Sequence, residues 1–289
     1  MISIIPEGFN DFACKGGSCR HTCCQVWEID IDEDTAEYYR QLPGKLGDDL
    51  RRSMVREDGT WHFRLNPQGY CHLLDPDGLC RVIKELGEDA LCDICTVHPR
   101  FFTYVYEYIL CGTGLCCEKT CEVMAALPGP LHFTQEETGD VFTFPELLEE
   151  MGLEDLPEAK LHFSPDLTRK ELEVMIRELS ATEPIDQAWT RDLQKIERDL
   201  EGALDRYHTF AENAPLLFFD RLYQYIFYRQ LDKEASYGME ILARYAQKST
   251  QFIMLQAART GDLLEAPRRW SEQIEYDTEN VDLLLSQQI

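Results

Sequence analysis

Residues 12–39 read FACKGGSCRHTCCQVWEIDIDEDTAEYY, and they hold four of the twelve cysteines of this 289-residue chain. All twelve lie between Cys14 and Cys121, and none follows in the long remainder. Cysteine that serves only as a small buried hydrophobe would be scattered along the chain. The grouping therefore indicates shared chemistry, in the form of disulfides, a bound metal ion or an iron–sulfur cluster.

The beginning of the chain argues against disulfides. It has no basic segment, long apolar segment or small-residue cleavage site of a secretory signal, so we expect a cytoplasmic protein. No apolar run approaches the roughly 20 residues that span a bilayer. Because structural disulfides are rare in the cytoplasm, the thiols are better interpreted as metal ligands. Their groups are Cys14, Cys19, Cys23 and Cys24; Cys71 and Cys80; Cys92 and Cys95; and Cys111, Cys116, Cys117 and Cys121.

The chain is strongly acidic, with a formal net charge of −25. This charge disfavours binding to nucleic acid and to anionic membrane surfaces, both of which require lysine and arginine. It would attract a cationic partner, such as a lysine-bearing protein segment. The simpler interpretation of the charge is solubility alone.

The composition changes at Leu127-Pro128-Gly129-Pro130. Residues 1–127 are predicted to form a cysteine-rich, metal- or cluster-binding region, and residues 128–289 a mainly helical one. We therefore expect a mostly α fold with a small β component, in which the cysteine-rich region packs against a C-terminal helical bundle.

Apolar periodicity, caps and turn residues predict the individual elements. Thr168 and Glu171 form a capping-box pattern, and Ile196, Leu200 and Leu204 recur at the spacing of one helical face. The aromatic run of residues 218–228 is typical of a buried helix. Helices are expected at 34–40, 79–86, 88–94, 117–127, 168–179, 188–207, 216–231 and 234–260, a strand at 102–110, and a short strand pair within 131–144.

The cysteine spacings predict a metal site of an irregular type. Cys92 and Cys95 have the two-residue spacer of many metal sites, but His98 and His132 stand in no zinc-finger arrangement. The ferredoxin spacing is also absent. One cluster, or one cluster plus zinc, is the expectation, because neighbouring side chains such as those of Cys23 and Cys24 diverge.

Three segments together resemble the flagellin lysine-N-methylase family, which is related to the putative zinc- or iron-chelating CxxCxxCC proteins. They are residues 12–39, residues 71–102 (CHLLDPDGLCRVIKELGEDALCDICTVHPRFF) and residues 112–124 (GTGLCCEKTCEVM). A looser similarity lies in residues 216–231. The resemblance implies a protein lysine N-methyltransferase that uses an iron–sulfur cluster of the 4Fe-4S type and S-adenosylmethionine to modify flagellin or a similar protein.

The resemblance also implies roles for individual residues. Trp27, Arg100 and Glu118 are the candidates for contact with the cofactor, and Glu118 is alternatively a helix N-terminal acid favoured by the dipole or a residue that binds the substrate amine. The remaining cysteines of the chain are extra to the family pattern and include Cys92. The implied metal ligands are Cys14, Cys19, Cys23, Cys24, Cys71, Cys80, Cys95 and Cys117.

His98, Arg100 and Asp32 are the candidate catalytic residues. His98 is a ligand, a base or a donor to a cysteine sulfur, although a lone histidine is usually structural. Arg100 suits the carboxylate of S-adenosylmethionine, or an internal salt bridge. Asp32 holds a ribose or a lysine ammonium, or caps the helix that follows. We expect the active site where Cys95, His98, Arg100 and Cys117 meet against the helices.

Two other functional classes remain open. One is a metal-stabilised binding module, with zinc or an iron–sulfur cluster, whose acidic helical part holds a cationic partner. The other is a metal-storage or redox-sensing protein, which would need exposed thiols of low pKa.

Overall fold

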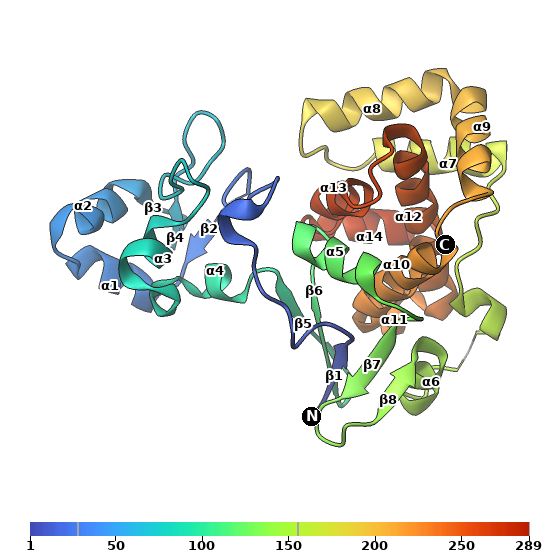
Figure 1. The fold of residues 1–289 in the computed structure, drawn as a ribbon, viewed down its shortest axis with the longest axis horizontal. Helices are drawn as coiled ribbons and strands as arrows, with labels where there is room; N and C mark the ends of the chain where they lie inside the picture. Colours follow the sequence, from blue (N-terminus) through green and yellow to red (C-terminus); the bar gives the residue numbers. More distant parts are fainter. Residues whose placement is uncertain (28, 155, 289) are drawn as a thin grey trace. The chain divides into compact units, whose positions relative to one another are not determined.

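The chain forms two compact units in a computed structural model that describes residues 1–27, 29–154 and 156–288 (Figure 1). Residues 13–101 form one unit, called the thiol unit because it holds eight of the cysteines. Residues 1–12 and 102–289 form the other, called the helical unit. The structure is 54% helical and 14% strand, which confirms the mostly α fold with a small β component. The cysteine-rich region predicted over residues 1–127 is shared between the two units.

A three-stranded sheet lies at the centre of the thiol unit. Its strands are β2 (Ile29–Ile31), β3 (Met54–Glu57) and β4 (Thr60–Phe63), in the antiparallel order β2-β4-β3. The turn between β3 and β4 is Asp58-Gly59, and both residues have positive φ, 48° and 91°. These are the dihedrals of a tight two-residue hairpin, which Asp-Gly adopts readily.

Short helices cover this sheet: α1 (Glu33–Gln41), α2 (Gly44–Ser53), α3 (Arg81–Leu86) and α4 (Asp93–Val97), with 3₁₀ turns η1 (Gly16–Ser18) and η2 (Glu88–Ala90). The helices predicted at 34–40 and 79–86 are confirmed as α1 and α3. The single helix predicted at 88–94 is wrong. Leu91 and Cys92 are extended between η2 and α4, and the Asp93 backbone N–H that would continue a helix donates to the Asp32 carboxylate instead.

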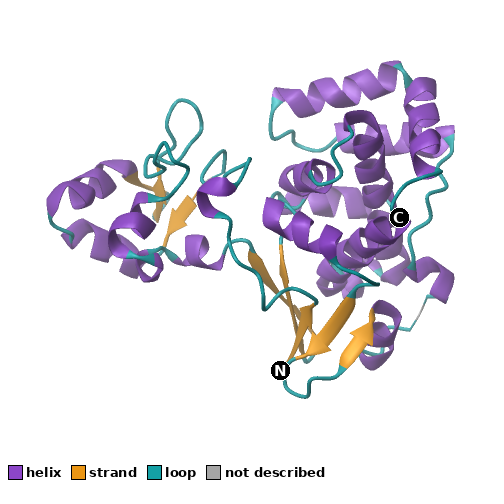
Figure 2. Ribbon diagram, in the orientation of Figure 1, coloured by secondary structure: helices purple, strands orange, loops and turns teal. Residues whose placement is uncertain are grey.

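The helical unit contains a five-stranded sheet, drawn as orange arrows in Figure 2. Its order is β5-β6-β1-β7-β8, formed by β1 (Ile2–Pro6), β5 (Arg100–Val105), β6 (Tyr108–Thr113), β7 (His132–Gln135) and β8 (Val141–Thr143). The strand pair predicted within 131–144 is confirmed as β7 and β8. The single strand predicted at 102–110 is wrong, because a turn at Tyr106-Glu107, with φ of 52° at Tyr106, divides it into β5 and β6.

Helices make up the rest of this unit. The aromatic helix α10 contacts the sheet through the Tyr228 hydroxyl, which lies 2.9 Å from the carbonyl oxygens of both Ile4 and Cys111 and donates its proton to one of them. Phe219, Tyr223 and Phe227 are at most 1% exposed, which confirms the predicted buried stripe. The helices are α5 (Glu118–Ala126), α6 (Phe144–Glu150), α7 (Arg169–Ser180), α8 (Gln187–Arg198), α9 (Leu200–Ala211), α10 (Leu216–Arg229), α11 (Glu234–Tyr237), α12 (Met239–Thr260), α13 (Glu265–Ile274) and α14 (Thr278–Ser286), with η3 (Glu158–Leu161) and η4 (Leu231–Lys233).

Two long predicted helices are each divided. The helix predicted at 188–207 breaks at Asp199, whose side chain accepts a hydrogen bond from the Gly202 N–H and so caps α9. The helix predicted at 234–260 breaks at Gly238, where φ is 79° and only glycine avoids steric cost. The capping box of Thr168 and Glu171 at α7 is confirmed.

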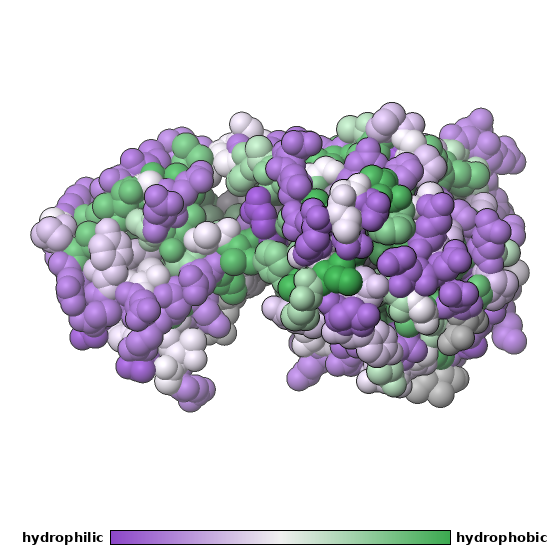
Figure 3. All heavy atoms as spheres, turned by 90° about the horizontal axis from the view of Figure 1, so that it is seen from below, coloured by the Kyte–Doolittle hydropathy of each residue, from purple (hydrophilic) through white to green (hydrophobic). Residues whose placement is uncertain are grey.

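Hydrophilic side chains cover much of the face seen in Figure 3. Such a surface agrees with the large excess of acidic residues. Among the described residues, the structure contains no helix with the length and apolar character needed to cross a bilayer.

Candidate thiol sites

Backbone pairing brings three thiol-bearing segments of the thiol unit together. The Cys71 N–H donates to the Cys24 carbonyl at 2.9 Å, and Leu74 forms an isolated bridge with Cys80. The loop between Cys71 and Cys80 is closed by a turn in which the Gly78 N–H donates to the Asp75 carbonyl. Cys24, Cys71 and Cys80 are therefore adjacent to one another in space, although 56 residues of sequence separate the first from the last.

Two glycines allow the loop before α1 to approach this turn. A Cβ atom at Gly17 would lie 2.4 Å from the Asp77 carbonyl oxygen. One at Gly78, whose φ is 79°, would lie 3.1 Å from the Gly17 Cα. Only glycine permits so close an approach of two backbones. The Lys15-Gly16-Gly17 segment thus places the loop that holds Cys14 and Cys19 against the Cys71–Cys80 loop.

Cys92 and Cys95 flank the first turn of α4. Cys92 is the N-cap residue, and its carbonyl accepts from the Thr96 N–H at 3.0 Å. The two side chains share a hydrogen bond, which lowers the pKa of Cys92 and raises the pKa of Cys95. The pair therefore holds one thiolate more readily than two.

Five thiols share one electrostatic neighbourhood. Burial, and to a smaller extent the charges of Cys24, Cys80 and Cys92, raise the pKa of Cys71 to about 12. A hydrogen bond from Cys23 lowers the pKa of Cys24 to about 7, against the effect of burial. Cys24 is therefore substantially ionised near neutral pH, and a thiolate is the form that binds metals.

The chemistry of these donors suits a thiolate-bound metal ion or iron–sulfur cluster, since four thiolates complete either kind of site. Among the described residues, however, no group of three or more His, Cys, Asp or Glu side chains is already arranged to hold a metal ion. The sulfurs thus gather in one place without a finished coordination geometry.

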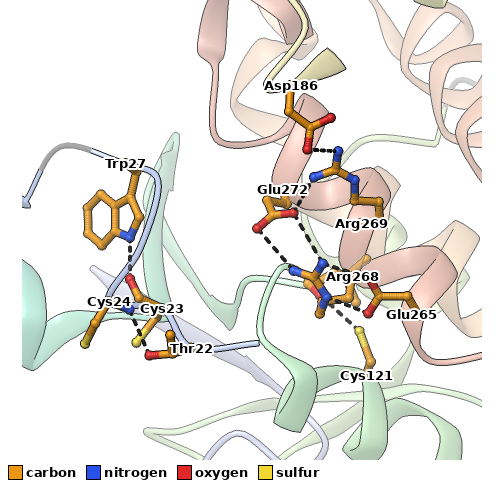
Figure 4. A network of polar contacts seen from close by, with 11 residues as sticks. Thr22, Cys23, Cys24, Trp27, Cys121, Asp186, Glu265, Arg268, Arg269 and Glu272 are labelled. Atoms are coloured by element: carbon orange, nitrogen blue, oxygen red, sulfur yellow. Dashed lines mark hydrogen bonds and ion pairs between the residues drawn. The ribbon is translucent and has the colours of Figure 1, made fainter. Parts of the chain in front are cut away.

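The other predicted ligands of this unit lie at its surface. Cys14 and Cys23 are exposed, and Cys19 is partly exposed. The Cys14 sulfur accepts from the Gly16 N–H at 3.3 Å, and the Cys23 carbonyl accepts from the Trp27 indole N–H at 2.6 Å (Figure 4). Sequence reasoning treated Cys92 as an extra, but the structure places it among the five. Its two-residue spacing from Cys95 was the signal.

Trp27 and His98 contact one another. Their rings stack with centroids 5.7 Å apart and planes inclined by 27°. Burial lowers the pKa of His98 to about 4, so the imidazole is neutral at pH 7. Arg100 follows two residues later, partly buried at the start of β5. His98 and Arg100 follow Cys95 by three and five residues in sequence, and their catalytic roles stay predictions.

Asp32 is a helix cap. Its carboxylate accepts from the Thr35 N–H at 2.8 Å and from the Asp93 N–H at 3.0 Å, so it joins the first turns of α1 and α4. Burial acts to raise the pKa of Asp32, but these hydrogen bonds outweigh it and lower the pKa below its ordinary value. The capping alternative for Asp32 is therefore present in the structure.

The helical unit holds a second group of thiols. Cys117 is the N-cap residue of α5, and Cys121 is fully buried one turn later, with its thiol donating to the Leu115 carbonyl at 3.0 Å. Burial raises the pKa of Cys116 to about 11. Glu118, the predicted cofactor contact, is only 4% exposed. The predicted meeting of Cys117 with Cys95, which belongs to the other unit, stays a prediction.

Charged residues of α10 and α13 surround this second group. Arg229 pairs with Glu275 at 3.3 Å, and the Glu275 side chain is 1% exposed. Arg268 interacts with the Cys121 sulfur and pairs with Glu265, as Figure 4 shows. The Arg229–Glu275 pair thus links α10 to the end of α13, and Arg268, which is paired within α13, reaches α5 through Cys121.

Comparisons with known proteins place the chain among relatives. It is 32% identical over 128 residues to a lysine-N-methylase from Salmonella choleraesuis and 33% identical to one from Salmonella typhimurium. It is 31% identical to the flagellar biosynthetic protein FliU from Salmonella muenchen. Each match covers 41% of this chain, together with 31% of each lysine-N-methylase and 75% of FliU.

The chain thus spans under a third of the length of the two lysine-N-methylases that it matches. No family model matches it, and no solved structure does.

Proposed function

This chain belongs to the flagellin lysine-N-methylase family, and we propose that it methylates lysine side chains of flagellin or of a similar protein. The observation that carries the proposal is the identity of 32–33% to proteins named lysine-N-methylase. The net charge of −25 supports it, because lysine-rich segments are attracted to an acidic protein.

The proposal includes two cofactors. S-adenosylmethionine supplies the methyl group, and an iron–sulfur cluster is held by thiolates of the thiol unit. The gathering of Cys24, Cys71, Cys80, Cys92 and Cys95 in one electrostatic neighbourhood supports the second part. Zinc bound by the same thiolates is the alternative.

The residues of the chain act on the lysine and on the methyl donor. A lysine must be neutral to attack, and removal from water lowers its pKa. The His98 imidazole, neutral at pH 7 because its pKa is about 4, would accept a hydrogen bond from the amine. Arg100 would bind the carboxylate of the methyl donor through paired hydrogen bonds. These contacts orient the two reactants and leave the chemistry to the donor.

Co-expression tests the activity. Flagellin produced together with the chain is expected to carry methylated lysines in a mass spectrum, and flagellin produced alone is expected to carry none. His98→Phe, which retains a ring to stack on Trp27, is the matched variant. Unmodified flagellin in the presence of the wild-type chain and its cofactors contradicts the proposal and favours the alternative of a metal-stabilised binding module.

Anaerobic purification tests the cluster separately. We expect a coloured protein that contains iron and sulfide, and loss of both in Cys24→Ser and Cys95→Ser. Cys111→Ser is the control, because Cys111 is a buried thiol of β6 in the other unit. A colourless protein with stoichiometric zinc would show that the thiolates bind zinc rather than a cluster. The co-expression result for methylation would still be judged separately.

A further inference from the structure

A groove lies between α8, α12 and α13 of the helical unit, far in sequence from every cysteine. Its volume is about 390 Å³, within the range of roughly 300–1,000 Å³ that is typical of small-molecule sites. The α8 residues that line it include Ala188, Trp189 and Asp192, which recur at helical spacing on one face. The groove is therefore formed by three regular elements rather than by loops.

The inner wall of the groove is aromatic and apolar. Trp189 of α8 meets Phe252 of α12 edge-on, with ring centroids 5.4 Å apart. Trp270 and Ala266 of α13 line the opposite wall and are 1% and 5% exposed. Trp189 and Phe252 are themselves 4% and 1% exposed, so the three rings form a buried floor, and an apolar group that enters the groove would contact their edges.

Both carboxylates that line the groove are already engaged by cations. Asp192 accepts two hydrogen bonds from Arg259, at 2.8 and 2.9 Å. Glu265 accepts from Arg268 at 2.7 Å, in the network of Figure 4. Neither carboxylate retains the uncompensated charge that would attract a cationic ligand.

The cations of α8 that line the groove are not neutralised in this way. Among the described residues, Arg191 bonds only to the neutral Gln187 amide, at 3.3 Å, and Lys195 forms no ion pair with a carboxylate. The charge of Lys195 acts on Asp192, which Arg259 already holds. The chain has 53 acidic residues against 28 basic ones, so two cations that lack an ion-pair partner in the described part of the chain make this groove locally suited to an anionic ligand.

We propose that this groove binds a small organic anion, with a carboxylate, sulfonate or phosphate group attached to an aromatic or apolar body. The anionic group pairs with Arg191 and Lys195 at the rim, and the apolar body packs beside Ala188 over the floor formed by Trp189 and Trp270. No cysteine lines the groove, and the proposal does not depend on the proposed methyl transfer.

The test uses the full chain and two fluorescent probes of the same shape. 1-Anilinonaphthalene-8-sulfonate carries a sulfonate, and N-phenyl-1-naphthylamine is its uncharged analogue. We expect the double variant R191E/K195E to bind the sulfonate about tenfold more weakly or worse, as the loss of charged hydrogen bonds implies. Binding of the uncharged probe is expected to change less than twofold.

Arg198→Glu is the matched control, because it reverses a charge on the same helix at a position that does not line the groove. A second variant, Ala188→Phe, fills the groove from its exposed rim and is expected to weaken both probes. The proposal is overturned if R191E/K195E binds the sulfonate as wild type does, if Arg198→Glu weakens it equally, or if Ala188→Phe leaves both probes unaffected.

Discussion

Asp32 gives the sharpest distinction between a structural and a chemical role in the thiol unit. Its carboxylate accepts from the backbone N–H groups of Thr35 and Asp93. Replacement of an N-cap aspartate by alanine costs about 1 kcal/mol, and loss of a second hydrogen bond costs about 1 kcal/mol more. Asp32→Ala is therefore expected to reduce the free energy of unfolding by about 2 kcal/mol.

Asp32→Asn separates the two roles, because asparagine caps helices about as well as aspartate but carries no charge. Its amide oxygen can replace the Oδ1 atom that accepts from Thr35, but its NH2 group cannot accept from the Asp93 N–H, so the variant should lose about 1 kcal/mol, half of the loss in Asp32→Ala, in a urea titration followed by circular dichroism. Asp30→Ala is the control, since Asp30 is the exposed residue of the neighbouring strand β2. Methylation of co-expressed flagellin is measured on the same proteins.

Acid titration adds a test, because the direction in which the free energy of unfolding changes with pH follows from the pKa of Asp32. The pKa of Asp32 is lowered in the folded protein, so its contribution to stability is present above the unfolded pKa of about 3.9 and is lost as the pH falls through the lower folded value. Asp32→Asn should lack this acid-side loss. Equal stability of Asp32→Ala and wild type would refute the capping role, and lost methylation in an Asp32→Asn variant that stays folded under the assay conditions would assign the carboxylate to the chemistry.

Three further substitutions probe burial, charge and backbone conformation. His98 has a pKa of about 4 in the folded protein, so as the pH falls from about 6.5 to 4 the unfolded chain takes up a proton at this histidine and the folded protein does not. The free energy of unfolding therefore declines over this range, and His98→Phe should make the decline shallower. An unchanged slope in denaturation measured across this range contradicts the expectation. Arg229→Met should reduce the free energy of unfolding by about 3 kcal/mol, because it leaves buried Glu275 without its ion-pair partner. Adding Glu275→Met should restore much of this loss in a double-mutant cycle, and additive losses of the two substitutions would refute the pairing. Gly78→Ala should reduce the free energy of unfolding by at least about 1 kcal/mol in the same assay, because φ is 79° and the added Cβ would crowd Gly17. An unchanged free energy of unfolding would contradict this strain.

Local rules predicted the elements whose determinants lie within a few residues. The capping box at Thr168, the strand pair β7–β8 and the aromatic core helix α10 all follow from short-range patterns. The Asp58-Gly59 hairpin carried an equally local signal that the prediction left unused. Patterns of this kind depend on the local conformational preferences of neighbouring residues, which can be read from a short stretch of sequence.

Other features depend on partners that are distant in sequence. The break between η2 and α4 requires Asp32 to take the Asp93 N–H from 61 residues away. The parallel pairing of β1 with β6, with Ile2 opposite Tyr108, joins the start of the chain to the helical unit and excludes it from the thiol unit. No window of local sequence contains either relationship, so the predicted continuous helix and the unpredicted strand β1 share one cause.

Cys92 shows the same limit for the site itself. Neighbours in sequence need not share one electrostatic neighbourhood: exposed Cys14 belongs to the same sequence group as Cys24, but the pKa of Cys95 responds to Cys92, Cys24 and Cys80. A ligand must be able to lose its proton beside other thiolates, and each added negative charge makes that harder without a metal ion. A cation that binds among these sulfurs relieves their repulsion. The mutual pKa effects therefore favour Cys92 as a ligand, although the family pattern omits it, and Cys92→Ser should lose bound metal while Cys14→Ser retains more of it.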